Sequence, residues 1–147
     1  MLWANDWVYG AAVILLCIIL HTITLIYLAR FIVQENLRRI RESSLLLSAM
    51  LFAMLALVSI ILHAGEAAIW ASLFIYLGAV TDFPSAYLHS LGAFTTLGDS
   101  TIIFDTKWRL LIQLESLNGA VALGLTTAML YSSAGKIERI VSTSSGK

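Results

Sequence analysis

The stretch Ala93-Phe94-Thr95-Thr96-Leu97-Gly98-Asp99-Ser100 decides the fold, because it is polar and contains glycine while long apolar segments flank it. Irregular backbone is tolerated at membrane depth only where it is buried in protein or lines a water-filled cavity. The stretch follows a short segment that begins at Pro84, and a long apolar segment comes after it. We therefore interpret it as the functional centre of a membrane protein and as a candidate pore.

The composition of the 147-residue chain is that of an integral membrane protein. Hydrophobic residues make up 59% of it and charged residues 12%, with a mean hydropathy of +0.88; soluble domains carry about 25% charged residues. Nine basic and nine acidic residues cancel, and no basic stripe interleaved with aromatic residues occurs, so nucleic acid is not an expected partner. The first apolar run is too long for the core of a signal peptide. The single cysteine, Cys17, is interpreted as a small buried apolar residue.

Three membrane-spanning helices are predicted, which gives an all-α fold. The first apolar run, 8–33, exceeds the roughly 20 residues that a bilayer crossing requires. We interpret 43–80 as one long outer helix that is bent near Gly65 or projects past the membrane. Two crossings with a turn at 63–66 are the alternative, but they would place the basic C-terminal tail and the arginine-rich segment on opposite sides. The last predicted span is an inner helix over 107–132.

The arginine-rich segment from Arg30 to Glu42 sets the predicted orientation. Because cytoplasmic loops carry an excess of Lys and Arg, the N-terminus is expected outside the cell and the C-terminus in the cytoplasm. The expected location is the cell membrane, with a bacterial inner membrane favoured. These arginines lie between spans rather than inside one, so they are not a voltage sensor. We expect them to contact membrane lipids.

A short helix is predicted over 84–95, between the second and third spans. The run Thr81-Asp82-Phe83-Pro84 signals its start, because Pro suits a first turn and Asp or Thr can cap it. Twelve residues are too few to cross a bilayer. We therefore expect this helix to enter the membrane and return from the same side.

Residues 67–131 resemble the pore module of the two-span bacterial potassium-channel superfamily, which covers a little under half of the chain. The resemblance rests on the order and spacing of four elements in a membrane context. They are Phe94-Thr95-Thr96 at the end of the short helix, Thr96-Leu97-Gly98 after it, Lys107-Trp108-Arg109-Leu110-Leu111 at the start of the last span, and Leu114-Glu115-Ser116-Leu117-Asn118-Gly119 within it.

The resemblance implies a homotetramer in which four copies of residues 95–101 form an ion-conducting filter. Stacked backbone carbonyls and a threonine hydroxyl supply the oxygens that a dehydrated cation needs. Permeant K⁺, Na⁺ and Ca²⁺ are the cations expected in the filter, and no other cofactor is expected. The implied domains are 1–42, an extra span with the basic loop; 43–135, the pore module; and 136–147, a cytoplasmic tail. The implied filter residues are Thr95, Thr96, Leu97, Gly98, Asp99 and Ser100, and the implied gate hinge is Gly119 or Gly124.

The sequence departs from the potassium signature, Thr-Val/Leu-Gly-Tyr-Gly-Asp, after its first glycine. Asp99 stands at the tyrosine position, Ser100 at the second glycine and Thr101 at the aspartate. An aspartate at the tyrosine position resembles the bacterial non-selective sodium/potassium channel pore, and four such carboxylates would attract cations. Serine, unlike glycine, adopts positive φ only at a cost. Two hypotheses follow: a weakly selective cation channel, and a non-conducting pore-like subunit with a degenerate filter.

Other polar residues in the apolar segments leave alternatives open. Glu115 is a candidate support behind the filter or a helix-packing group, and Asn118 could line the cavity or bond a neighbouring helix. His63 and Glu66 are spaced i, i+3 and are weak metal candidates that would need His89 or another subunit. His21 is interpreted as a core histidine. The sequence contains no nucleophile–base constellation and no phosphate loop, so an enzyme is not expected.

Overall fold

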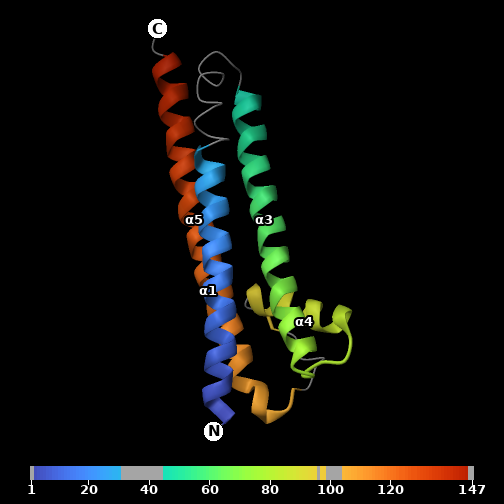
Figure 1. Ribbon diagram of the computed structural model, residues 1–147. Helices are drawn as coiled ribbons and strands as arrows, with labels where there is room; N and C mark the ends of the chain where they lie inside the picture. Colours follow the sequence, from blue (N-terminus) through green and yellow to red (C-terminus); the bar gives the residue numbers. More distant parts are fainter. Residues whose placement is uncertain (1, 31–44, 96, 99–103, 146–147) are drawn as a thin grey trace. The chain divides into compact units, whose positions relative to one another are not determined.

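The computed structural model describes residues 2–30, 45–95, 97–98 and 104–145, and every regular element in those ranges is helical. The α-helices are α1 (Leu2–Leu28), α3 (Leu45–Tyr76), α4 (Phe83–Phe94) and α5 (Arg109–Ser145), with the 3₁₀-helix η2 (Thr106–Trp108) before α5 (Figure 1). The all-α prediction is confirmed for the described part of the chain. Residues 31–44, which include all of the arginine-rich segment except Arg30, lie outside the described residues.

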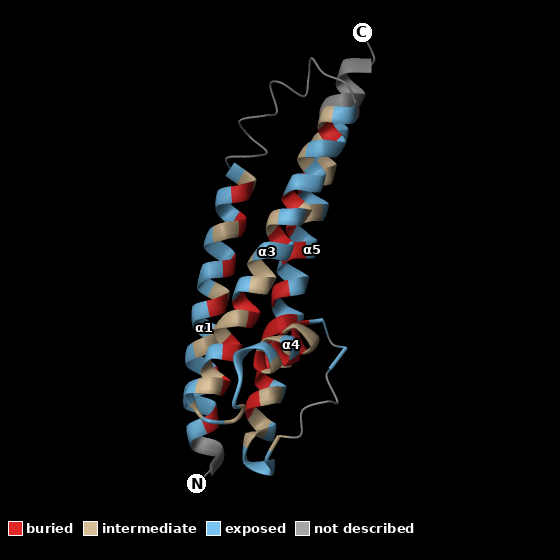
Figure 2. Ribbon diagram, turned by 90° about the vertical axis from the view of Figure 1, so that its right-hand side faces the viewer, coloured by how far each residue is buried: buried red, intermediate tan, exposed pale blue. Residues whose placement is uncertain are grey.

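Three of these helices are long and apolar enough to cross a membrane. The candidate spans are Asn5–Leu28, Leu46–Tyr76 and Thr106–Arg139, which confirms the prediction of three. The second span is a single helix that continues through Gly65 without interruption, as preferred over two crossings. Exposed residues recur along all three helices (Figure 2). Many of them are leucine and isoleucine, which suits segments that face lipid.

Two predicted helix ends differ from the structure. The outer helix was expected to reach residue 80, but α3 ends at Tyr76 because Gly78 adopts φ +66° and closes the helix. The N–H of Ala79 donates to the carbonyl of Phe74, the long-range bond of a glycine-terminated helix. At the other end of the chain, α5 runs on to Ser145 rather than ending near residue 132, and no proline interrupts it.

The short helix α4 begins and ends as its sequence dictates. Asp82 caps it: the Asp82 side chain accepts a hydrogen bond of 3.0 Å from the N–H of Ser85, and Pro84 occupies the first turn. At 12 residues the helix is about 18 Å long. The predicted range, 84–95, is therefore off by one residue at each end.

The chain divides into two compact units, and each has its own core. The first unit comprises Met1–Leu20 and Leu62–Leu123, and the second comprises His21–Ile61 and Gly124–Lys147. The core of the second unit is a small cluster of Leu25, Leu28, Leu55 and Met129. The first unit contains α4 and has the larger core, built from Cys17, Ala67, Trp70, Phe74, Phe94, Leu111, Leu114 and Ala122.

Candidate functional site

Helix α4 packs on both of the long helices that precede and follow it in the chain. On α5, it meets Gly119: a Cβ at that position would lie 2.7 Å from the Cα of Phe94 and 3.1 Å from its carbonyl oxygen. On α3, the ring of Phe94 lies edge-on to His63, with centroids 6.4 Å apart. Backbone and side chain of Phe94 therefore fix the carboxyl end of α4 in the first unit.

These contacts place the end of α4 well along both long helices. Gly119 follows Arg109, the first residue of α5, by ten positions, which is about 15 Å along the helix axis. His63 precedes Tyr76, the last residue of α3, by thirteen positions, or about 20 Å. The hydrocarbon core of a bilayer is about 30 Å thick. If α3 and α5 cross it, the carboxyl end of α4 lies near its middle.

The chain turns back on α4 directly after its last residue. The carbonyl of Gly92 accepts hydrogen bonds of 3.1 Å from the N–H groups of both Leu97 and Gly98. The Thr95 hydroxyl lies 3.1 Å from the carbonyl oxygens of Leu91 and Gly92 and so donates back to the same helix end. Gly98 adopts φ +69°, the left-handed conformation that favours glycine. These contacts cap α4 and begin the loop that carries the predicted filter.

Of the predicted filter residues, the structure describes Thr95, Leu97 and Gly98. The side chain of Leu97 is 86% exposed, although its backbone N–H is bound to α4. Thr96, Asp99 and Ser100 lie outside the described residues. The assignment of these six residues to a filter stays a prediction.

A buried polar group joins α4 to α5 one turn before the helix end. The Nε2 atom of His89 lies 3.7 Å from a carboxyl oxygen of Glu115, and both side chains are buried. Two aromatic rings flank the imidazole: the centroid of Phe104 is 4.5 Å away and that of Phe74 is 5.8 Å away. The carboxyl of Glu115, which lies in a candidate span, is thus enclosed beside a histidine rather than on the outer face of the helix, as expected for a carboxyl in a membrane-spanning segment.

Two further polar residues, Ser90 and Asn118, are buried on the same two helices. Ser90 follows His89 on α4 and is fully buried, and Asn118, three residues after Glu115 on the same face of α5, is 2% exposed. Within the described residues, both Glu115 oxygens, the Ser90 hydroxyl and both amide atoms of Asn118 make no hydrogen bond of ordinary geometry. Buried polar atoms without partners require an explanation.

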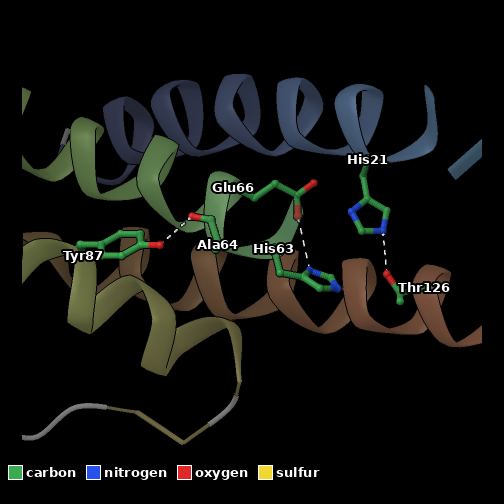
Figure 3. A network of polar contacts seen from close by, with 6 residues as sticks. All are labelled: His21, His63, Ala64, Glu66, Tyr87 and Thr126. Atoms are coloured by element: carbon green, nitrogen blue, oxygen red, sulfur yellow. Dashed lines mark hydrogen bonds and ion pairs between the residues drawn. The ribbon is translucent and has the colours of Figure 1, made fainter. Parts of the chain in front are cut away.

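On the α3 side, His63 and Glu66 form a second imidazole–carboxyl pair. Their side-chain atoms lie 3.6 Å apart, and the Glu66 side chain is 1% exposed. Tyr87 of α4 donates a hydrogen bond of 3.3 Å to the carbonyl of Ala64 in the same turn (Figure 3). Within the described residues, His89 does not join His63 and Glu66 in a metal-sized group of ligand atoms. The metal site weighed from the sequence therefore does not form from these three side chains.

The remaining predicted residues lie in the second unit. His21 of α1 lies 3.1 Å, through its Nε2 atom, from the hydroxyl of Thr126 on α5, and both residues are buried (Figure 3). This agrees with its interpretation as a core histidine. Gly124, the alternative hinge, has no atom within 4 Å of the position that a Cβ would take. The two predicted hinge glycines thus have opposite surroundings.

Two aspartates cap helices outside the candidate spans, and hydrogen bonds hold the pKa of each below its usual value. The Ser85 N–H lowers the pKa of Asp82 at the start of α4. The Lys107 N–H lowers the pKa of Asp105, which caps η2 at the entry to α5. The Lys107 ammonium also lies 3.6 Å from Asp105. Both caps therefore favour the ionised carboxylate.

Sequence reasoning missed three features of the site. Ser90 was passed over because a serine in a short helix carries no signal for burial. Phe74 and Phe104 were not recognised as a surrounding for His89, since they are distant in sequence. Gly10 of α1 was also missed, yet a Cβ there would lie 2.5 Å from Leu114. Its position among apolar residues could have suggested a close helix contact.

Comparison with models of protein families, with curated proteins and with solved structures found no match.

Proposed function

We propose that the protein is a homotetrameric cation channel with weak selectivity among monovalent cations. The observation that carries this proposal is the position of α4, a short helix whose carboxyl end meets Gly119 about 15 Å along a candidate span. A helix end carries about half a negative charge there, which favours a cation at that depth. The loop that follows α4 supplies backbone carbonyls and hydroxyls, the ligands of cation filters.

The tetramer belongs to the proposal because one chain offers a single such loop. A ring of oxygens around a dehydrated cation needs several copies. In this arrangement Asp99 would place four carboxylates near the outer mouth, and Gly98 would give the first turn of the filter its left-handed backbone. The carbonyls of Leu97 and Gly98 would then line the ion path, together with residues 96 and 99–101.

Flux of K⁺, Na⁺ and Ca²⁺ into liposomes that contain the purified protein tests this proposal. We expect monovalent flux that Gly98→Ala abolishes, because alanine at φ +69° is strained. Gly78→Ala is the matched control: Gly78 has φ +66°, and neither glycine has an atom within 4 Å of its Cβ position. Equal flux in the two variants, or none in the wild type under any gradient, would contradict a pore at residues 95–101.

A non-conducting pore-like subunit is the second candidate, and the identity of residue 100 favours it. Serine replaces the glycine that the resembling filters carry at this position, so the upper carbonyls could lose their orientation. The double substitution D99Y and S100G separates the two candidates. A silent wild type whose double variant conducts K⁺ is a degenerate channel, whereas silence in both favours a structural subunit.

A further inference from the structure

Helix α4 carries a single side chain that can become positively charged, and the fold buries it. His89 is the only histidine, lysine or arginine in residues 83–94, and its side chain is 6% exposed. Its Nε2 atom lies 3.7 Å from a carboxyl oxygen of Glu115 on α5, whose side chain is fully buried. The ring centroids of Phe104 and Phe74 lie 4.5 Å and 5.8 Å from that of the imidazole, which gives the pair apolar neighbours. His89 and Glu115 therefore form a buried, titratable contact between the short helix and the last span.

The apolar surroundings limit how many protons this pair can hold. Two protons would leave an imidazolium beside a neutral carboxyl, and no proton would leave a carboxylate beside a neutral imidazole. Either state places one net charge in the interior, where an unaccompanied charge is costly. A single proton makes the pair neutral as a whole, whether it sits on the imidazole or on the carboxyl. The buried pair therefore favours one proton.

Neighbouring titratable groups do not replace His89 as the partner of Glu115. On α3, Glu66 lies 3.6 Å from His63, and before α5 the exposed Lys107 lies 3.6 Å from Asp105. Among the described residues, no second basic side chain forms an ion pair with Glu115. On α1, the buried Cys17 thiol is close enough to Glu115 to feel its charge. The other titratable side chains on the elements of this unit are Asp6, Tyr9, Tyr76, Asp82, Tyr87 and Arg109.

We propose that His89 and Glu115 bind one proton as a unit, and that this proton holds α4 against α5. With the proton bound, the pair is neutral and the docked helix is stable. Loss of the proton at alkaline pH leaves a buried charge, so α4 separates from α5 more readily. The carboxyl end of α4 would follow, because Phe94 packs on Gly119 only five residues after His89. The proton would thereby regulate a pore at residues 95–101, but its action on α4 does not require ion conduction.

The pH at which the contact weakens follows from proton linkage. When α4 separates, both side chains gain access to water and titrate near their ordinary values, about 6.5 for histidine and about 4.3 for glutamate. Between these values the separated pair also holds one proton, so the separation should not depend on pH. Above about pH 6.5 the separated pair has lost its proton while the docked pair keeps it. The opening equilibrium should then rise about tenfold per pH unit until the docked pair also loses its proton.

Hydrogen exchange of the α4 amides, measured on the full-length protein in a neutral detergent from pH 5 to 8, tests the proposal. Exchange of these amides reports the opening of α4. Because the α4 sequence is the same in the wild type and in Glu115→Gln, the ratio of their exchange rates at each pH is the ratio of their opening equilibria. We expect this ratio to rise about tenfold per pH unit between about pH 6.5 and 8. Glu138→Gln, the same change at an exposed position of α5, should give a ratio that does not change with pH.

Three further variants assign the proton to the pair. In His89→Gln, Glu115 is left as the only titratable member, so opening should already rise with pH between about pH 5 and 6.5, where the wild type is constant. This shift of the onset, read after correction for intrinsic exchange, decides the question if Glu115→Gln does not fold. Cys17→Ala and Glu66→Gln remove neighbouring titratable groups and should keep the onset and the slope of the wild type.

Three results would overturn the proposal. A constant ratio of wild-type to Glu115→Gln exchange from pH 5 to 8 means that no proton on the pair controls α4. A pH dependence that disappears in Glu66→Gln and persists in Glu115→Gln assigns the proton to the pair on α3. The same onset in the wild type and in His89→Gln means that His89 does not share the proton. Because ion flux plays no part in these measurements, their failure leaves the channel proposal standing, and the reverse also holds.

Discussion

Replacement of Gly119 by alanine should destabilise the protein, whereas the same change at Gly124 should not. A Cβ at residue 119 would lie 2.7 Å from the Phe94 Cα, while carbon atoms pack at about 3.5–4.0 Å. The clash is with backbone, so α4 and α5 must separate by about 1 Å. Overpacking of this kind costs about 1–3 kcal/mol, and here the upper end applies. Improved helix propensity returns about 1 kcal/mol, so the net loss is about 2 kcal/mol.

Gly124→Ala gains the same propensity with no atom within 4 Å of its new methyl group. We therefore expect it to stabilise α5 by about 0.5–1 kcal/mol, so the two variants should differ by about 2–3 kcal/mol. Free energies of unfolding in mixed micelles with increasing dodecyl sulfate measure this difference, with the fluorescence of fully buried Trp70 as one probe. Equal stability of the two variants would refute the close approach of α4 to α5.

Three further substitutions test local contacts by their effect on unfolding. Asp82→Asn keeps a cap on α4 but removes the pH dependence of that cap. Because the pKa of Asp82 is lowered in the folded state, the wild-type carboxylate stabilises the fold above about pH 4, and this contribution is lost as the pH falls through the folded pKa. The free energy of unfolding should therefore fall less steeply with acid in the variant than in the wild type. Tyr87→Phe deletes the bond to Ala64 and should cost about 0.5–1.5 kcal/mol, measured in mixed micelles. Thr126→Val removes the contact with His21 and should cost about the same, with unchanged helicity by circular dichroism.

The helices could be predicted from the sequence because their signals are local. Apolar length alone gives three spans, and Asp82 with Pro84 gives the start of α4. Helix ends were harder, since Gly78 had to be recognised as a terminator at the end of α3. The continuation of α5 past residue 132 was missed because a polar composition was taken for a tail. The segment contains no proline, and its one internal glycine, Gly135, is tolerated within the helix, so polar composition was the wrong guide.

The contacts of the candidate site could be predicted only in part. Glu115 and Asn118 stand out as polar residues in an apolar span, and the structure places both in the interior of the first unit. Their neighbours on α4, His89 and Ser90, come from the packing of elements distant in sequence, which no periodicity reports. Gly119 was predicted as a hinge, and its contact with Phe94 gives it a packing role that spacing alone does not reveal.

The cap on α4 limits which oxygen atoms could coordinate a cation in the proposed pore. The carbonyl of Gly92 already accepts two N–H groups, and the Thr95 hydroxyl directs its hydrogen toward the same helix end. The carbonyl of Gly92 is therefore a poor candidate for coordinating a cation, and α4 would act on a cation through its helix dipole. In the proposed pore, the coordinating oxygens would come from the loop after α4 together with the hydroxyl oxygen of Thr95. If the protein conducts as proposed, conduction would depend on the backbone after Gly98. Ser100 stands there at the position of the second glycine in the potassium signature that the sequence resembles, so selectivity for K⁺ would be the property most sensitive to this difference.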